Sequence, residues 1–211
     1  MKNDFLEKVG EEEWKFIHSI RNKKLVRQII NKEIDLFPKS FNFDSHRLEW
    51  GWLENRPFLR VCHLIGLDLF NKGHIIEAIK HFKQMLIWNP NDNQGIRELL
   101  ADIYVKEKNW EEMLSLAKIY PSDVNPSVGY GEAIALYKTG SIQKATKKLK
   151  ACLKYLPLCA KILLEDNPKK PNLEVPGYVI FGGEGQAYEF WEYQGEAWKD
   201  KEIQEWIKSN V

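Results

Sequence analysis

The stretch GHIIEAIKHFKQMLIWNPNDNQG, residues 73–95, decides the fold. It begins with a glycine, continues with apolar residues three and four apart, and reaches a proline at Pro90. Apolar residues at this spacing lie on one face of an α-helix, because the helix turns about once every 3.6 residues. A glycine before the helix and a proline after it mark its boundaries. The stretch is therefore predicted to be the second helix of a helix-turn-helix pair.

A second stretch repeats this pattern. The residues GSIQKATKKLKACLKYLP, 140–157, align with residues 73–90, so that Gly140, Ala145 and Pro157 each follow their counterparts by 67 residues. This offset is close to twice the period of about 34 residues that is typical of tetratricopeptide repeats. A middle copy at residues 95–121 keeps the apolar spacing, although Met113 replaces the small residue and the second helix is predicted to be short.

Residues from about 57 to 157 thus resemble three tetratricopeptide repeats. The resemblance rests on these positions: Gly66, Gly73, Ala78, Phe82, Pro90, Ala133, Gly140, Ala145 and Pro157. Small residues allow two helices to approach closely, and large ones fill the space between neighbouring pairs. Cys62 and Gly129 depart from the family, which usually has tryptophan there. The resemblance implies an all-α fold, a helix-turn-helix superhelical array or α-α solenoid.

The array divides the chain into three predicted parts. Residues 1–56 are expected to form an N-terminal helical cap or degenerate repeat, with one or two helices between residues 11 and 36. The repeats are placed at 57–90, 91–123 and 124–157. Residues 158–211 are expected to form a loop, with at most a short extended piece at 177–181, and short C-terminal helices that pack on the array.

The C-terminal helices are unusually rich in aromatic residues. They carry Tyr188, Phe190, Trp191, Tyr193, Trp198 and Trp206. So many rings are not expected to stay in water. We expect them to cap the last repeat; filling the groove of the array or forming a homodimer interface are the alternatives.

The wider layout carries a narrower resemblance. The segments WLENRPFLR, LFNKGHIIEAIKHFKQML, NPNDNQGIRELL and GYVIFGGEGQAYEFWEYQGEAW are similar to bacterial tetratricopeptide proteins related to the eukaryotic suppressor-of-tumorigenicity-type family. The similarity covers residues from about 50 to 206. It implies no enzymatic activity.

Composition narrows the class of protein. The chain has 211 residues, of which 44% are hydrophobic and 29% charged, so it can bury a sizeable core. The 31 lysines and arginines nearly balance 30 acidic residues, which gives no global electrostatic argument for nucleic acid. No stretch approaches about 18 consecutive apolar residues, and the first residues do not form a signal peptide. A cytoplasmic protein without a membrane partner is expected.

The sequence shows no recognisable catalytic, metal-binding or phosphate-binding motif. A metal site would need more converging ligands than His74, His81 and Glu77. The glycines around residue 183 lack the lysine and serine or threonine of a phosphate-binding loop. The three cysteines, at irregular spacing, indicate neither disulfides nor a zinc site. We therefore expect no catalytic residues, no metal and no cofactor, and predict that the chain is not an enzyme.

The concave groove of such an array suits a peptide or a partner protein. We define as groove residues those that the repeat pattern places there: Arg60, His63, Leu67, Glu98, Asp102, Lys106, Tyr130, Ile134, Tyr137 and Lys138. His63 and Leu67 occupy the positions of the lysine and asparagine that clamp chaperone tails, which argues against that ligand. The predicted function is a non-catalytic protein-protein interaction scaffold.

Two alternatives remain open. The chain could be a regulatory subunit of an enzyme complex, or it could bind nucleic acid through a basic helix. That helix carries Lys144, Lys147, Lys148, Lys150 and Lys154. A solvated surface explains such lysines as well, and the sequence shows no exposed aromatics between them on which bases could stack.

Overall fold

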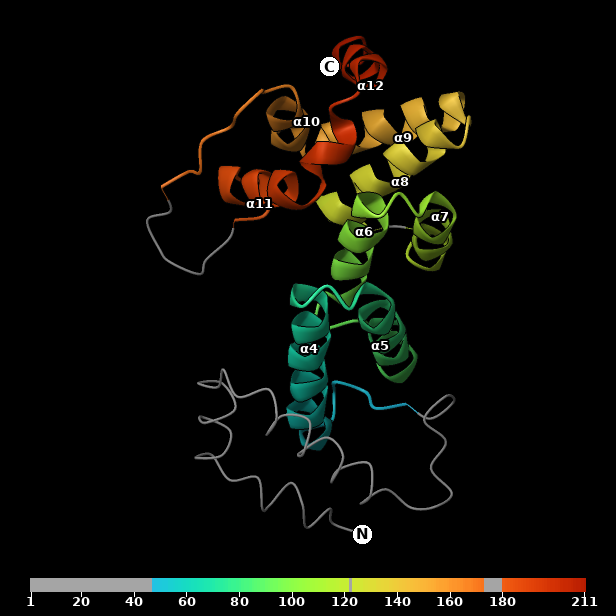
Figure 1. The fold of residues 1–211 in the computed structure, drawn as a ribbon, viewed down its shortest axis with the longest axis vertical. Coiled ribbons are helices and arrows are strands. Elements are labelled where there is room, and N and C mark those ends of the chain that lie inside the picture. Colours follow the sequence, from blue (N-terminus) through green and yellow to red (C-terminus); the bar gives the residue numbers. More distant parts are fainter. Residues whose placement is uncertain (1–46, 122, 173–179) are drawn as a thin grey trace. The chain divides into compact units, whose positions relative to one another are not determined.

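The computed structural model describes residues 47–121, 123–172 and 180–211 (Figure 1). The helices predicted between residues 11 and 36 lie outside the described residues, as do residues 177–179 of the predicted extended piece. Every regular element within the described ranges is a helix. The prediction of an all-α fold is therefore confirmed for this part of the chain.

The described residues form two compact units, divided between Ile96 and Arg97. In the first, the 3-10 helix η1 (Leu53–Asn55) leads into α4 (Arg56–Asn71), which packs against α5 (Ile75–Trp88). The buried ring of Phe82 on α5 lies directly against Gly66 on α4. Gly66 therefore allows the two helices to approach closely at this point.

Gly73 makes the turn between α4 and α5. Its φ of +77° lies in the left-handed region, and its N–H donates to the carbonyl of Phe70 at 2.9 Å. The following N–H, of His74, donates to the carbonyl of Leu69 at 2.9 Å. These bonds satisfy carbonyls at the end of α4, as a glycine cap is expected to do. Gly140 has a φ of +81° after the equivalent helix of the second unit, so both predicted glycine caps are confirmed.

The second unit is built around one central helix. Its elements are α6 (Ile96–Lys106), α7 (Trp110–Ile119), α8 (Pro126–Lys138), α9 (Ile142–Tyr155), α10 (Pro157–Leu163), α11 (Glu184–Gln194), the 3-10 helix η2 (Gly195–Trp198) and α12 (Lys201–Lys208). Helix α8 packs against α7, α9 and α11. From Pro126 to Ala135 only Glu132 is not fully buried.

Pro157 has a double role that the sequence pattern did not predict. It follows the end of α9 at Tyr155, as a stop signal should, but it also opens α10. Proline suits a first helical turn because its missing N–H would have had no partner within the helix. The chain thus turns directly into another helix at this proline.

Three of the aromatic C-terminal residues, Phe190, Trp198 and Trp206, lie on α8. The ring of Tyr130 is 5.3 Å from that of Phe190 and 6.0 Å from that of Trp198, measured between centroids. Tyr137, two turns along α8, lies 4.5 Å from Trp206. These pairs form one continuous aromatic layer that covers a side of the central helix.

Candidate nucleic-acid interface

The groove residues differ in their exposure to solvent. In the first unit, Arg60, His63 and Leu67 of α4 are half-buried. The guanidinium of Arg60 lies 5.4 Å from the ring centroid of Trp50, and burial lowers the pKa of His63. In the second unit, Glu98 and Tyr137 are half-buried, whereas Lys106 and Lys138 are exposed, and Lys138 is ion-paired with Asp200.

The remaining groove residues are interior. Tyr130 and Ile134 have no exposed surface, and Asp102 is 7% exposed. The hydroxyl of Tyr130 donates to the carbonyl of Leu156 at 2.7 Å, inside the unit. The aromatic layer covers the side of α8 on which Tyr130 lies, and Asp102 of α6 is bonded to the buried Gln194 of α11, so these residues belong to the interior and offer no surface to a ligand.

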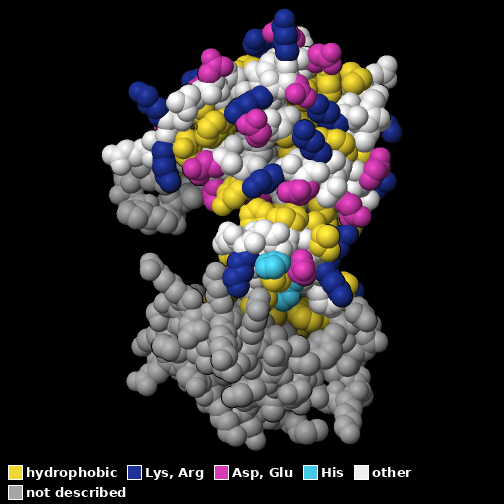
Figure 2. All heavy atoms as spheres, viewed as in Figure 1, with side chains coloured by type: hydrophobic (Ala, Val, Ile, Leu, Met, Phe, Trp, Pro, Cys, Tyr) yellow, Lys and Arg dark blue, Asp and Glu magenta, His cyan; other side chains and the backbone are white. Residues whose placement is uncertain are grey.

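The basic surface of the second unit lies on α9. In Figure 2 the visible face of this unit carries both basic and acidic side chains. A surface with charge of a single sign is therefore found only at the level of single helices. Helix α9 carries five lysines and no aspartate or glutamate. Ala145, Leu149 and Cys152 are its buried residues and attach it to the core. The apolar spacing that packs α9 therefore leaves its lysines on the outer side.

One of the five lysines differs from the others. The ammonium of Lys148 lies 2.6 Å from the Glu132 carboxylate of α8, and both side chains are half-buried. Its charge is thus neutralised within the unit. The other four side chains are exposed, and we call them the lysine face: Lys144, Lys147, Lys150 and Lys154. In the described part of the chain, none of the four has an ion-pair partner.

Helix α9 is also bonded to the C-terminal helix, α12. The indole N–H of Trp206 donates to the hydroxyl of Thr146 at 3.0 Å. This bond fixes α12 against α9 on a flank of the lysine face. The lysines thus project from a helix that is supported on two sides.

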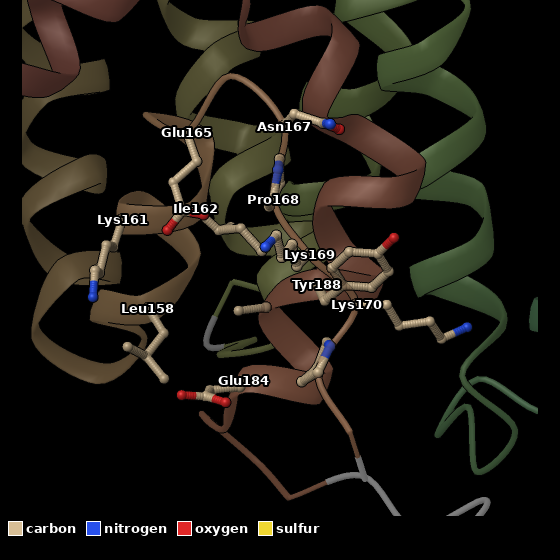
Figure 3. Close-up of a pocket in the computed structure, with 12 residues that line it drawn as sticks. Leu158, Lys161, Ile162, Glu165, Asn167, Pro168, Lys169, Lys170, Glu184 and Tyr188 are labelled. Atoms are coloured by element: carbon tan, nitrogen blue, oxygen red, sulfur yellow. The ribbon is translucent and has the colours of Figure 1, made fainter.

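A cavity of about 480 Å³ lies between α10, α11 and the segment that follows α10 (Figure 3). Apolar walls come from Leu158, Ile162 and Ala187, while the rim carries three lysines: Lys161, Lys169 and Lys170. Glu165 and Glu184 also line it, so its charge is mixed. The cavity is therefore less suited to a polyanion than the lysine face is.

Chemically reactive residues do not gather anywhere in the described ranges. No group of three or more histidine, cysteine or acidic side chains there could hold a metal ion. Cys62, Cys152 and Cys159 are buried free thiols, and burial raises the pKa of Cys152 and of Cys159 to about 12. Such thiols stay protonated at neutral pH and are poor nucleophiles. The imidazole Nε2 of His81 bonds to the Cys62 carbonyl at 2.7 Å.

Comparison with protein families identifies the chain. Residues 29–211 match the family described as "Transcriptional repressor TCF25". The chain belongs to the Tcf25 family. No curated protein and no solved structure matches the chain.

Membership of the Tcf25 family corrects the sequence interpretation. The match is not to a tetratricopeptide family, so that identification was wrong, as was the predicted function of a tetratricopeptide scaffold that binds a peptide in its groove. Glycine turns and small-large packing are needed wherever two antiparallel helices pack closely, so they predict helix pairs without specifying the family. Within the described ranges no helix is long and apolar enough to cross a membrane.

Proposed function

We propose that this Tcf25-family chain acts in transcriptional repression and contacts the phosphate backbone of nucleic acid through the lysine face. The family description supports the transcriptional role. The observation that supports the contact is a helix with four exposed, unpaired lysines and no acidic residue. This proposal takes up the basic-helix alternative and assigns the chain no catalytic role.

The near-zero net charge does not oppose this proposal. Without the five lysines of α9, the chain has 26 lysines and arginines against 30 acidic residues, a formal charge of −4. Helix α9 therefore carries a local excess of positive charge, while the rest of the chain has a small negative net charge. A local positive helix can hold a polyanion, and the acidic remainder disfavours contact elsewhere.

The geometry of α9 sets a quantitative expectation. Lys144 and Lys154 are ten residues apart, which spans about 15 Å along a helix. This length allows the four ammonium groups to meet several successive phosphates. Four phosphate contacts predict a slope of log affinity against log salt of about −3 for a single strand and about −4 for B-DNA.

A salt titration with matched variants tests the proposal. Fluorescence anisotropy would follow binding of the full chain to a labelled DNA duplex and to a labelled oligouridine. In one variant all four lysines of the lysine face become glutamine. In the control variant four exposed lysines elsewhere become glutamine: Lys80, Lys118, Lys199 and Lys201. Both variants lose the same charge.

We expect the lysine-face variant to lose at least about tenfold in affinity and most of its salt dependence, while the control stays close to the wild type. Equal losses in the two variants, or no binding by the wild type, would contradict the proposal.

A transcriptional role also favours a nuclear location over the cytoplasm, which imaging of the tagged full chain would test.

A further inference from the structure

We propose that the lysine face selects single-stranded nucleic acid, because bases stack on the rings of Tyr155 and Phe181 beside it. This inference rests on the proposed function and deepens it. The sequence showed no exposed aromatic residues among the lysines of α9. The structure reveals two at the C-terminal end of that helix, and they come from segments 26 residues apart in the chain.

Tyr155 is the first ring. It is the last residue of α9 and 58% of its surface is exposed, in contrast with the buried Tyr130. The ammonium of Lys154 lies 5.6 Å from the centroid of the Tyr155 ring. A cation that can contact a phosphate and a ring that can contact a base are therefore presented at the same place.

Phe181 is the second ring, at the tip of a tight turn, and 57% of its surface is exposed. The N–H of Gly183 donates to the carbonyl of Ile180 at 2.9 Å, and Gly182 has a φ of +73°. The N–H of Gly182 also donates to the side-chain oxygen of Gln186 on α11, at 2.7 Å. This bond anchors the turn to α11, and the anchored turn presents the Phe181 ring to solvent.

The two rings belong to neighbouring segments. A Cβ atom on Gly182 would lie 3.7 Å from the carbonyl oxygen of Tyr155 and 3.8 Å from a methyl group of Leu156. The backbone next to Phe181 therefore lies close to the end of α9. The turn and the helix together place two exposed rings at the end of a row of lysines.

This combination favours one kind of ligand. Single strands offer unpaired base faces and phosphates together, and base-aromatic stacking tolerates any base because every base has a π face. In a duplex the bases are already stacked on each other, so the rings gain no such contact. The exposed Tyr193 of α11 has Glu189 and Glu192 close by in the same helix, so it lacks the positive surroundings that a polyanion needs.

The test compares single-stranded and duplex probes. Labelled oligouridine and a labelled DNA duplex would be titrated with the full chain, with the double variant Tyr155→Leu and Phe181→Leu, and with Tyr193→Leu as the matched control. We expect the wild type to prefer oligouridine. The double variant should weaken oligouridine binding about a hundredfold, about tenfold for each ring, and leave duplex binding unchanged. The control should bind both probes as the wild type does.

A second variant distinguishes the loss of stacking from the loss of folding. Tyr155→Trp enlarges the ring and should tighten oligouridine binding, which a partly unfolded protein would not do. In addition, 4-thiouridine in the probe should crosslink to Tyr155 or Phe181 after irradiation. Crosslinks confined to other segments would overturn the inference.

The outcomes separate this inference from the proposed function. Binding that depends on the lysine face but not on the two rings would overturn the stacking inference alone. Binding of neither probe would overturn both. Polyglutamate, added at equal charge concentration, could displace oligouridine while the ring variants have no effect. This result would show a site for an acidic polypeptide and would also overturn the stacking inference.

Discussion

The side-chain amide of Gln194 donates a hydrogen bond to Asp102 Oδ1 at 2.8 Å, and so joins α11 to α6 across 92 residues of sequence. The same nitrogen donates to the backbone carbonyl of Ser127 at 2.9 Å, at the start of α8. Both side chains are buried. One amide therefore links three helices in the interior of the second unit.

The pH dependence of stability is the first prediction. Burial raises the pKa of Asp102 from its usual range to about 7, with Glu98 and Glu189 adding to the rise and the bonds from Gln194 and Ser127 opposing it. The folded state therefore holds this proton more tightly than the unfolded chain. This contribution to stability is fully present below the unfolded pKa, near 4, and is lost as pH rises toward 7, by at most about 1.4 kcal/mol per pH unit.

The variant Asp102→Asn should remove this contribution. Asparagine retains an oxygen that can accept the bond from Gln194, but it does not titrate. Urea unfolding between about pH 4 and pH 8 should show the variant gaining on the wild type as pH rises. Parallel curves for the two proteins would show that Asp102 does not titrate in this window.

The second prediction concerns the coupling of Gln194 and Asp102. Gln194→Leu keeps the approximate size of the side chain but removes one of the two hydrogen bonds to the buried carboxyl of Asp102, which should cost about 1–3 kcal/mol of unfolding free energy. In the double variant with Asp102→Leu, no buried carboxyl remains. A double-mutant cycle by urea unfolding should therefore give a smaller loss than the sum of the two single losses. Additive losses would show that the two residues do not act together.

Tyr130 gives the third prediction. Because its hydroxyl bonds to the Leu156 carbonyl inside the unit, Tyr130→Phe should lower the unfolding free energy by about 1 kcal/mol. Tyr137→Phe is the matched control, since Tyr137 is half-buried and its hydroxyl makes no hydrogen bond to a described residue. Thermal unfolding of both variants measures the difference. Equal stabilities would mean that the buried bond contributes nothing.

Local helix signals were readable from the sequence. The glycine caps at Gly73 and Gly140 and the packed helix pairs α4–α5 and α8–α9 follow from residue types a few positions apart, which local sterics decide. The short second helix of the middle pair was also predicted correctly, since α7 has 10 residues whereas α5 and α9 have 14 each. These features need no knowledge of distant contacts.

Features that depend on distant contacts could not be read in this way. The burial of Tyr130 depends on Phe190 and Trp198, which arrive 60 or more residues later. Likewise, the distinction between Lys148 and the other lysines of α9 depends on Glu132 of α8. Phe181 becomes part of the candidate interface only because its turn packs against the end of α9. Periodicity identifies one packing face of each helix, but it does not show which other residues are covered by distant segments.

The last prediction tests the contact between α4 and α5. A Cβ on Gly66 would overlap the ring atoms Cε1, Cζ and Cδ1 of Phe82, which is wholly buried. Alanine gains up to about 1 kcal/mol over glycine within a helix, but overpacking of this kind costs about 1–3 kcal/mol or more, so Gly66→Ala should destabilise the protein.

Two further variants make this prediction specific. Gly51→Ala is the control, because a Cβ there meets no atom within 4 Å and should leave the unfolding free energy nearly unchanged. Adding Phe82→Leu to Gly66→Ala replaces the ring with a smaller side chain and should recover part of the loss. Urea unfolding measures all three. If Gly66→Ala were as stable as the wild type, α4 and α5 would be able to move apart without loss. The prediction that the contact between Gly66 and Phe82 excludes a methyl group would then be wrong.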